Sequence, residues 1–141
     1  MAENYTWDLQ EGLMVESDIK SYLAENQAHF THWDVTDQLT ELYKKAGYSK
    51  AELARRSGMS EVFLYQMFSG RRTASRDKLI CFCIGLEASL EETQRLLERA
   101  TYAKLYPRNR RDAIIAHGLI HHTPLEKIND NLFAENERTL Y

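Results

Sequence analysis

Three tetrapeptides of the form Ser/Thr-x-x-Glu constrain the fold of this chain most, because each one predicts where an α-helix begins. They start at Ser49, Ser89 and Thr123. In such a capping box the hydroxyl accepts a backbone N–H while the Glu reaches back to the capping residue. Asn109 starts a weaker version with Asp as its fourth residue, and Pro124 suits a first helical position, where no N–H is needed. The chain is therefore predicted to consist of short helices.

Apolar residues recur at helical spacing between these signals, and no alternating run typical of a strand is long. Helices are predicted at about 17–30, 35–46, 50–57, 61–69, 76–86, 90–102, 109–121 and 124–134. The fold class is therefore all-α. In the first of these helices Ile19, Tyr22 and Leu23 share one apolar face. Residues expected on the inward faces of the others include Leu39, Leu42, Leu79, Ile80, Phe82, Leu96, Leu97, Ile115, Leu119, Leu125, Ile128, Leu132 and Phe133.

Composition bounds the class of protein. With 141 residues the chain is expected to be one domain, or one domain with an appended arm. No apolar run approaches the roughly 20 residues of a membrane span, and the N-terminus lacks the pattern of a signal peptide, so a cytoplasmic location is expected. Cys81 and Cys83 stand two apart in a predicted helix and cannot bridge each other, so they are interpreted as reduced core residues.

Charge is distributed unevenly along the chain, although the net charge of −3 does not indicate a nucleic-acid-binding protein. Residues 1–35 hold seven acids against Lys20 alone, and residues 71–112 hold ten bases against six acids. Two interpretations stay open: an acidic arm beside a basic working surface, or an unevenly charged solvated surface.

Segment 49–72 is predicted to form two short helices joined by a sharp turn. Gly58 lies where a positive φ is favoured, and Ser60 can cap the second helix. Small Ala54 lets the two helices cross closely. Leu53, Leu64 and Met67 are expected to face the core, and Gly70 is expected to end the second helix.

With these features, residues 36–99 or so resemble the lambda-repressor-like, xenobiotic-response-element (XRE) family of helix-turn-helix domains. The resemblance implies a lambda-repressor-like bundle, here with an extra N-terminal helix and a C-terminal helix pair. The expected organisation is an acidic arm at 1–34, the helix-turn-helix domain at 35–103 and a helical extension at 104–141 that packs on it. The implied function is that of a sequence-specific, DNA-binding transcriptional regulator of bacterial or phage origin that binds double-stranded DNA as a homodimer.

The resemblance also implies which residues contact DNA. Lys50 would lie near a phosphate, and residues after the cap of the second helix would meet base edges. Gln66 can pair with adenine and Glu61 can accept from cytosine N4. The expected nucleic-acid-binding residues are Lys50, Ser60, Glu61, Val62, Tyr65, Gln66, Arg71, Arg72 and Arg76.

The second helix departs from the family pattern, because Val62, Phe63 and Phe68 stand where polar residues are usual. For Phe63 and Phe68, core packing, a protein interface and DNA contact all stay open. The alternative function is therefore a protein–protein interaction module or an antitoxin-like adaptor. It would use the apolar helix 61–69 and the C-terminal helices to hold a protein partner.

Three cations, Arg108, Arg110 and Arg111, gather at the start of a predicted helix, where they oppose the helix dipole. Compensation is expected either from acidic groups of the protein, such as those of the N-terminal arm, or from an anionic ligand or partner. His117 and His121 have a spacing that can hold a metal, but no third-ligand pattern accompanies them. We expect no metal, no cofactor and no enzymatic activity.

Overall fold

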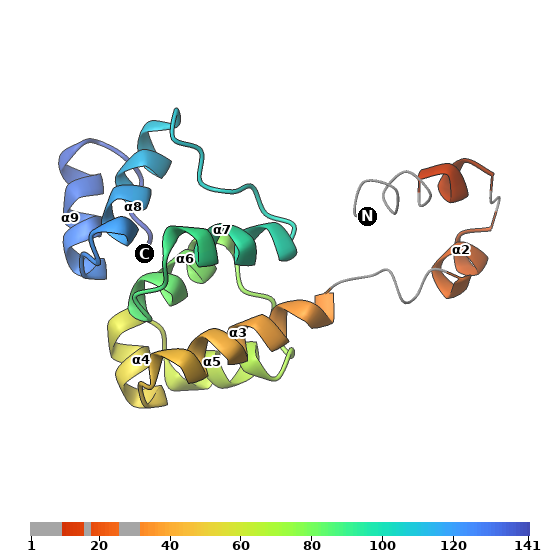
Figure 1. Ribbon diagram of the computed structural model, residues 1–141, viewed down its shortest axis with the longest axis horizontal. Coiled ribbons are helices and arrows are strands. Elements are labelled where there is room, and N and C mark those ends of the chain that lie inside the picture. Colours follow the sequence, from red (N-terminus) through yellow and green to blue (C-terminus); the bar gives the residue numbers. More distant parts are fainter. Residues whose placement is uncertain (1–9, 16–17, 26–31) are drawn as a thin grey trace. The chain divides into compact units, whose positions relative to one another are not determined.

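The computed structural model describes residues 10–15, 18–25 and 32–141, and every regular element in those ranges is a helix (Figure 1). The all-α fold class is confirmed. The chain divides into two compact units, residues 1–31 and residues 32–141, which are described separately. In the described ranges, no helix is long and apolar enough to cross a membrane.

In the first unit, residues 10–15 are helical and α2 spans Ile19–Glu25. The Asp18 carboxylate accepts the backbone N–H of Lys20 at 3.1 Å and the hydroxyl of Ser21 at 3.0 Å, so it satisfies groups at the start of α2. Of the three apolar residues expected on one face of this helix, Tyr22 is buried, whereas Ile19 and Leu23 are exposed. The helix predicted at 17–30 begins later than expected, and residues 26–30 lie outside the described ranges.

The second unit contains seven helices within residues 32–141: α3 (His32–Ala46), α4 (Lys50–Ser57), α5 (Glu61–Phe68), α6 (Arg76–Gly85), α7 (Leu90–Arg99), α8 (Arg110–Ile120) and α9 (Leu125–Ala134). All start within one residue of the prediction except α3, which starts three residues earlier than predicted. Capping explains most starts. Ser89 forms a reciprocal capping box with Glu92, whereas Ser49 and Asn109 only accept a backbone N–H.

The predicted capping box at Thr123 is wrong. Pro124 occupies the capping position of α9, which has no side-chain cap. Thr123 instead ends α8: its N–H donates to Gly118 O at 2.9 Å, and the His122 N–H donates to Leu119 O at 3.3 Å. This pair of bonds is a Schellman motif, which places His122 in the left-handed region at a φ of 53°.

Helix α6 forms the centre of the core, because its residues from Leu79 to Gly85 are all buried. It packs on α4, α7, α8 and α9. The approach of α4 is closest at Gly85, where a Cβ atom would lie 3.0 Å from both the backbone N and the Cβ of Ser57. Two helices can cross this closely only where one lacks a side chain.

The two cysteines belong to this core, which confirms their interpretation as packing residues. Cys81 and Cys83 are free and buried in α6. Burial raises the pKa of each thiol to about 12, because the apolar surroundings disfavour the thiolate. Neither thiol is therefore a nucleophile near neutral pH.

The C-terminal helices present one prediction that is wrong: Phe133 is 77% exposed. The buried positions of α9 are Leu125, Ile128, Asn129 and Leu132, and Phe133 is turned about 100° from Leu132. Asn129 faces inward because its side-chain oxygen accepts the N–H of Leu140 at 2.7 Å. The chain after α9 thus folds back and fills part of the core.

A substitution at Gly118 tests the crossing of α8 and α9. A Cβ at this position would lie 2.4 Å from Cδ1 of Ile128, a buried side chain with little room to move. Gly118→Ala should lower the free energy of unfolding by about 1–2 kcal/mol, since overpacking outweighs the gain in helix propensity.

The second variant of this test is Ile128→Ala. It should cost less stability in the Gly118→Ala background than in the wild type, because it removes the clash. Urea unfolding of the two single variants and the double variant measures this coupling. If the losses in unfolding free energy of the two single variants simply added up in the double variant, the close contact between Gly118 of α8 and Ile128 of α9 would be contradicted.

Candidate nucleic-acid interface

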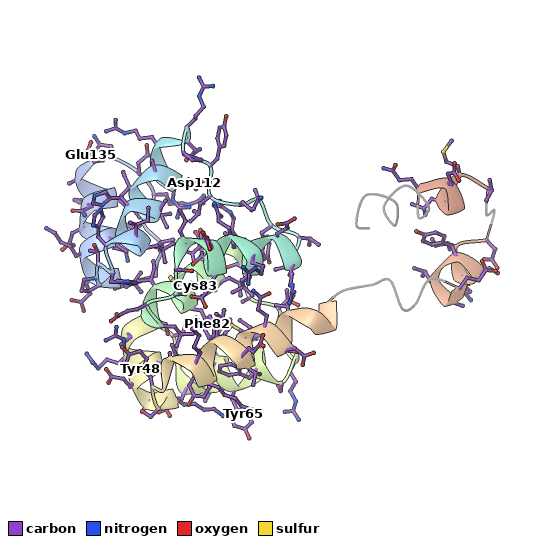
Figure 2. All side chains as sticks on the ribbon, viewed as in Figure 1. Tyr48, Tyr65, Phe82, Cys83, Asp112 and Glu135 are labelled. Atoms are coloured by element: carbon purple, nitrogen blue, oxygen red, sulfur yellow. The ribbon has the colours of Figure 1, made fainter. Side chains whose placement is uncertain are left out.

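One side of α5 is open to solvent. At about 100° per residue, Glu61, Tyr65, Ser69, Val62 and Gln66 fall in that order within an arc of about 140°. Val62 is 68% exposed and Tyr65 is 65% exposed. Glu61 and Ser69 are also exposed, and Gln66 is half-buried. Figure 2 shows Tyr65 pointing away from the helices, whereas Phe82 lies among them. We call these five residues the exposed arc.

The opposite side of α5 faces the core. Leu64 and Met67 are buried there, as predicted. Phe63 and Phe68 lie at the two edges of the buried side and are half-buried against the core. The Phe68 ring packs at 5.3 Å from Tyr43 and 5.8 Å from Phe82, measured between ring centroids. Of the three readings left open for the two phenylalanines, core packing is the one that the structure supports.

The turns at both ends of α5 fix its position. Gly58 ends α4 at a φ of 67°, and Ser60 caps α5 by accepting the Phe63 N–H at 3.0 Å. At the other end, Gly70 has a φ of 78° and the Arg71 N–H donates to Gln66 O at 3.0 Å. Gly58 adopts the left-handed conformation that the sequence predicted for it, and Gly70, predicted to end the second helix, follows α5 in the same conformation.

Cations flank α5 on both edges. The Lys50 ammonium lies 4.6 Å from the ring centroid of Tyr65, and both Arg72 and Lys78 lie over the Phe63 ring, at 5.7 and 5.3 Å. Cation–π contacts of this kind contribute about 0.5–1 kcal/mol at exposed sites. They hold the cations beside the helix without neutralising their charge.

Ion pairing separates the cations beside α5 from those of α4. Within the part of the chain that the structure describes, Lys50, Arg71, Arg72 and Lys78 form no ion pair within 4.0 Å. By contrast, the α4 cations Arg55 and Arg56 pair with Glu52 and Glu87. A group of cations that have no opposing charge among the described residues, beside an exposed helix, can attract and bind a polyanion.

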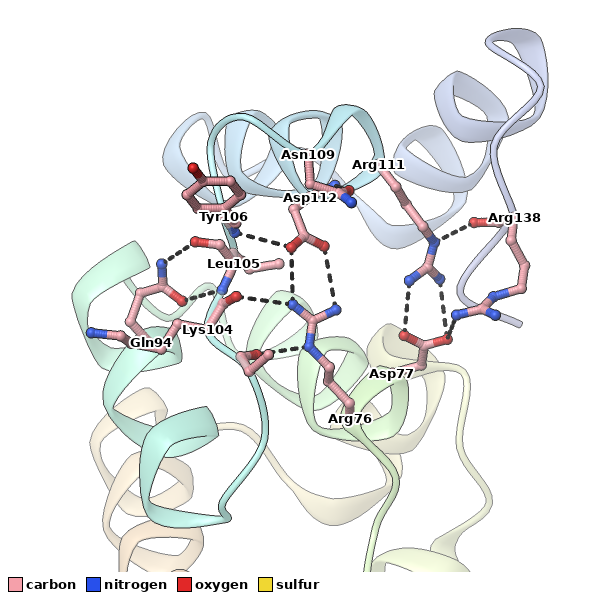
Figure 3. Close-up of polar contacts among 11 residues, drawn as sticks. Arg76, Asp77, Gln94, Lys104, Leu105, Tyr106, Asn109, Arg111, Asp112 and Arg138 are labelled. Atoms are coloured by element: carbon pink, nitrogen blue, oxygen red, sulfur yellow. Dashed lines mark hydrogen bonds and ion pairs between the residues drawn. The ribbon is translucent and has the colours of Figure 1, made fainter.

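The structure gives Arg76 a different place from the one expected. Its guanidinium points into the protein and binds the Asp112 carboxylate through two nitrogens, at 3.1 and 3.3 Å (Figure 3). It also donates to the carbonyl oxygens of Ala103 at 2.8 Å and Lys104 at 3.2 Å. Arg76 therefore anchors the segment between α7 and α8, and its charge is not available to a phosphate.

Pairing within the protein also accounts for two of the three cations at the start of α8. Arg111 donates two hydrogen bonds to the Asp77 carboxylate, each at 3.1 Å, and Arg110 pairs with Glu135 and Glu137. The partners are thus on α6 and after α9. Arg108 is exposed.

His117 and His121 are exposed, and their ring centroids lie 4.3 Å apart. In the described ranges, no three His, Cys, Asp or Glu side chains are grouped so that they can hold a metal ion.

Sequence reasoning did not identify Lys78 as one of the cations that lie beside α5. Ser75 caps α6 by accepting the Lys78 N–H at 3.2 Å, which places Lys78 in the first turn, over Phe63. The signal was present, because Ser75 stands directly before an apolar-periodic segment.

Comparison with known families agrees with this geometry. Residues 34–96 match the model of a family described as a helix-turn-helix domain. No curated protein and no solved structure matches the chain.

If Arg76 is a structural residue, its removal should lower the free energy of unfolding. Arg76→Ala would leave the buried Asp112 carboxylate without its cation and two loop carbonyls without their donor. We expect the free energy of unfolding to fall by roughly 2–4 kcal/mol. Arg55→Ala is the matched control: its pair with Glu52 is exposed to solvent, so this variant should keep the wild-type urea midpoint. Equal urea midpoints for Arg76→Ala and the wild type would refute this assignment.

Proposed function

We propose that this protein, whose residues 34–96 match a helix-turn-helix domain family, is a sequence-specific, DNA-binding transcriptional regulator that inserts α5 into the major groove. The observation that supports this most directly is a set of four cations beside the exposed arc that form no ion pair with the described residues: Lys50, Arg71, Arg72 and Lys78. We call these four residues the flanking cations.

The proposed mechanism divides the contacts into two kinds. The flanking cations neutralise phosphates and release counterions, which supplies affinity for any sequence. Residues of the exposed arc approach base edges: the Gln66 amide pairs with adenine, and the Glu61 carboxylate accepts from cytosine N4. Ser60, whose hydroxyl oxygen already caps α5, can still donate its proton to a phosphate. Arg76 is left out of this set.

One helix of eight residues reads only a few base pairs. We therefore propose that two copies bind together, each with its α5 in one half-site, at a spacing of about 34–36 Å or a multiple of it. The protein would act in the compartment that holds the DNA, which is the cytoplasm if the source is a bacterium or phage.

A protein-binding role is the second candidate, because α5 exposes one aliphatic and one aromatic side chain, Val62 and Tyr65. The half-buried state of Phe63 and Phe68 reduces the apolar surface available for such a role. An antitoxin-like adaptor would combine both partners. Salt dependence separates the candidates, since only a polyanion releases many counterions.

Binding to duplex DNA should weaken steeply with salt. With four phosphate contacts per copy, the slope of log K against log salt should be roughly −3 to −4 per copy. Arg71→Ala should weaken binding to all sequences and flatten that slope by about 1. Fluorescence anisotropy of a labelled duplex, titrated at several salt concentrations, measures both effects.

The matched control is Arg108→Ala, which removes an exposed cation near α8 rather than α5. It should leave both affinity and slope unchanged. A slope near zero for the wild-type protein would exclude the regulator and leave the protein-binding role.

A further inference from the structure

The exposed arc of α5 carries no guanine reader. Arg and Lys make the commonest specific contact with guanine, through O6 and N7, and Asn or Gln pair with adenine. None of the five arc residues is Arg, Lys or Asn, and Gln66 is the one amide among them. The arc therefore lacks the side chains that most often contact guanine itself.

The nearest cations are held away from the centre of the arc. Lys50 lies over the rings of Tyr65 and Phe68, at 4.6 and 5.9 Å, and Arg72 and Lys78 lie over Phe63, at the edge of the buried side. These contacts place the three cations at the two edges of the arc, which suits phosphates on either side of a groove better than bases at its floor.

Val62 provides the apolar contact on the arc. It is 68% exposed and lies about 100° around the helix axis from Glu61, between Ser69 and Gln66. The thymine 5-methyl is the apolar group on the major-groove edge of the base pairs. A valine methyl that excludes water from it gains about 0.8 kcal/mol, the value for one buried methylene, which equals about fourfold in affinity.

We infer that α5 selects half-sites containing thymine: Val62 contacts a thymine 5-methyl, and Gln66 pairs with the adenine of a neighbouring base pair. This inference rests on the proposed function and names the sequence class that the site takes. It assigns the selection of A·T base pairs to these two residues, beside the proposed contact of Glu61 with cytosine, while the flanking cations supply affinity without selection.

Replacing thymine by deoxyuridine tests the methyl contact, because uracil keeps every hydrogen-bonding group of thymine and lacks only the methyl. The full chain is first used to enrich binding duplexes from a random-sequence pool. The enriched duplex is then synthesised with deoxyuridine at each thymine in turn, and its affinity is measured at fixed salt. At one thymine per half-site, we expect the wild type to lose about fourfold in affinity.

Two variants assign that loss to Val62. Val62→Ser removes both methyl groups and should bind the thymine and uracil duplexes equally at that position. Val62→Thr keeps one methyl and should retain most of the discrimination. Because the side chain is largely exposed, both variants should keep the wild-type unfolding midpoint, which excludes misfolding as the cause.

The outcomes separate the two proposals. Salt-dependent binding with equal affinity for thymine and uracil at every position would overturn the inference and leave the regulator standing. Discrimination that persists in Val62→Ser would also overturn it, because the methyl would then be read by another residue. Absence of salt-dependent binding to any duplex would overturn both.

Discussion

The enclosure of α6 by α4, α7, α8 and α9 is the constraint on which the second unit depends. An apolar helix that is covered on all sides fixes the helices around it, because protein interiors pack too densely to allow sliding. At Gly85 the missing side chain lets the backbone of α4 approach, and α4 then passes through the left-handed turn at Gly58 into α5. The orientation of the exposed arc is thus set by packing at the core.

Ion pairing distinguishes structural cations from those of the candidate interface. Arg76 and Arg111 each form two hydrogen bonds with a carboxylate, and they join α6 to α8. The flanking cations have no such partners among the described residues. Arg108 also forms no ion pair within 4.0 Å among the described residues, so the proposal rests on four such cations grouped beside an exposed helix, and not on the state of any single one.

Helix starts could be predicted from the sequence and several helix ends could not. Starts depend on local caps such as Ser49, whereas α6, α7, α8 and α9 end with Glu87, Thr101, His122 and Asn136 in the left-handed conformation, without glycine to mark the place. The site was predictable to a similar degree. Position in the motif indicated α5 and its exposed arc. The ion pair between Arg76 and Asp112 could not be predicted, because it joins residues 36 apart in sequence and depends on the packing of α8 against α6.

The most direct test of the account is an NMR titration, in which changes in the backbone amide chemical shifts of the ¹⁵N-labelled full chain are measured as duplex DNA is added at low salt. The account predicts the largest changes at Lys50 and at residues 60–72, with α9 unaffected. Changes centred on α8 and α9 and absent from α5 would contradict it, since the surface in contact with DNA would then lie elsewhere.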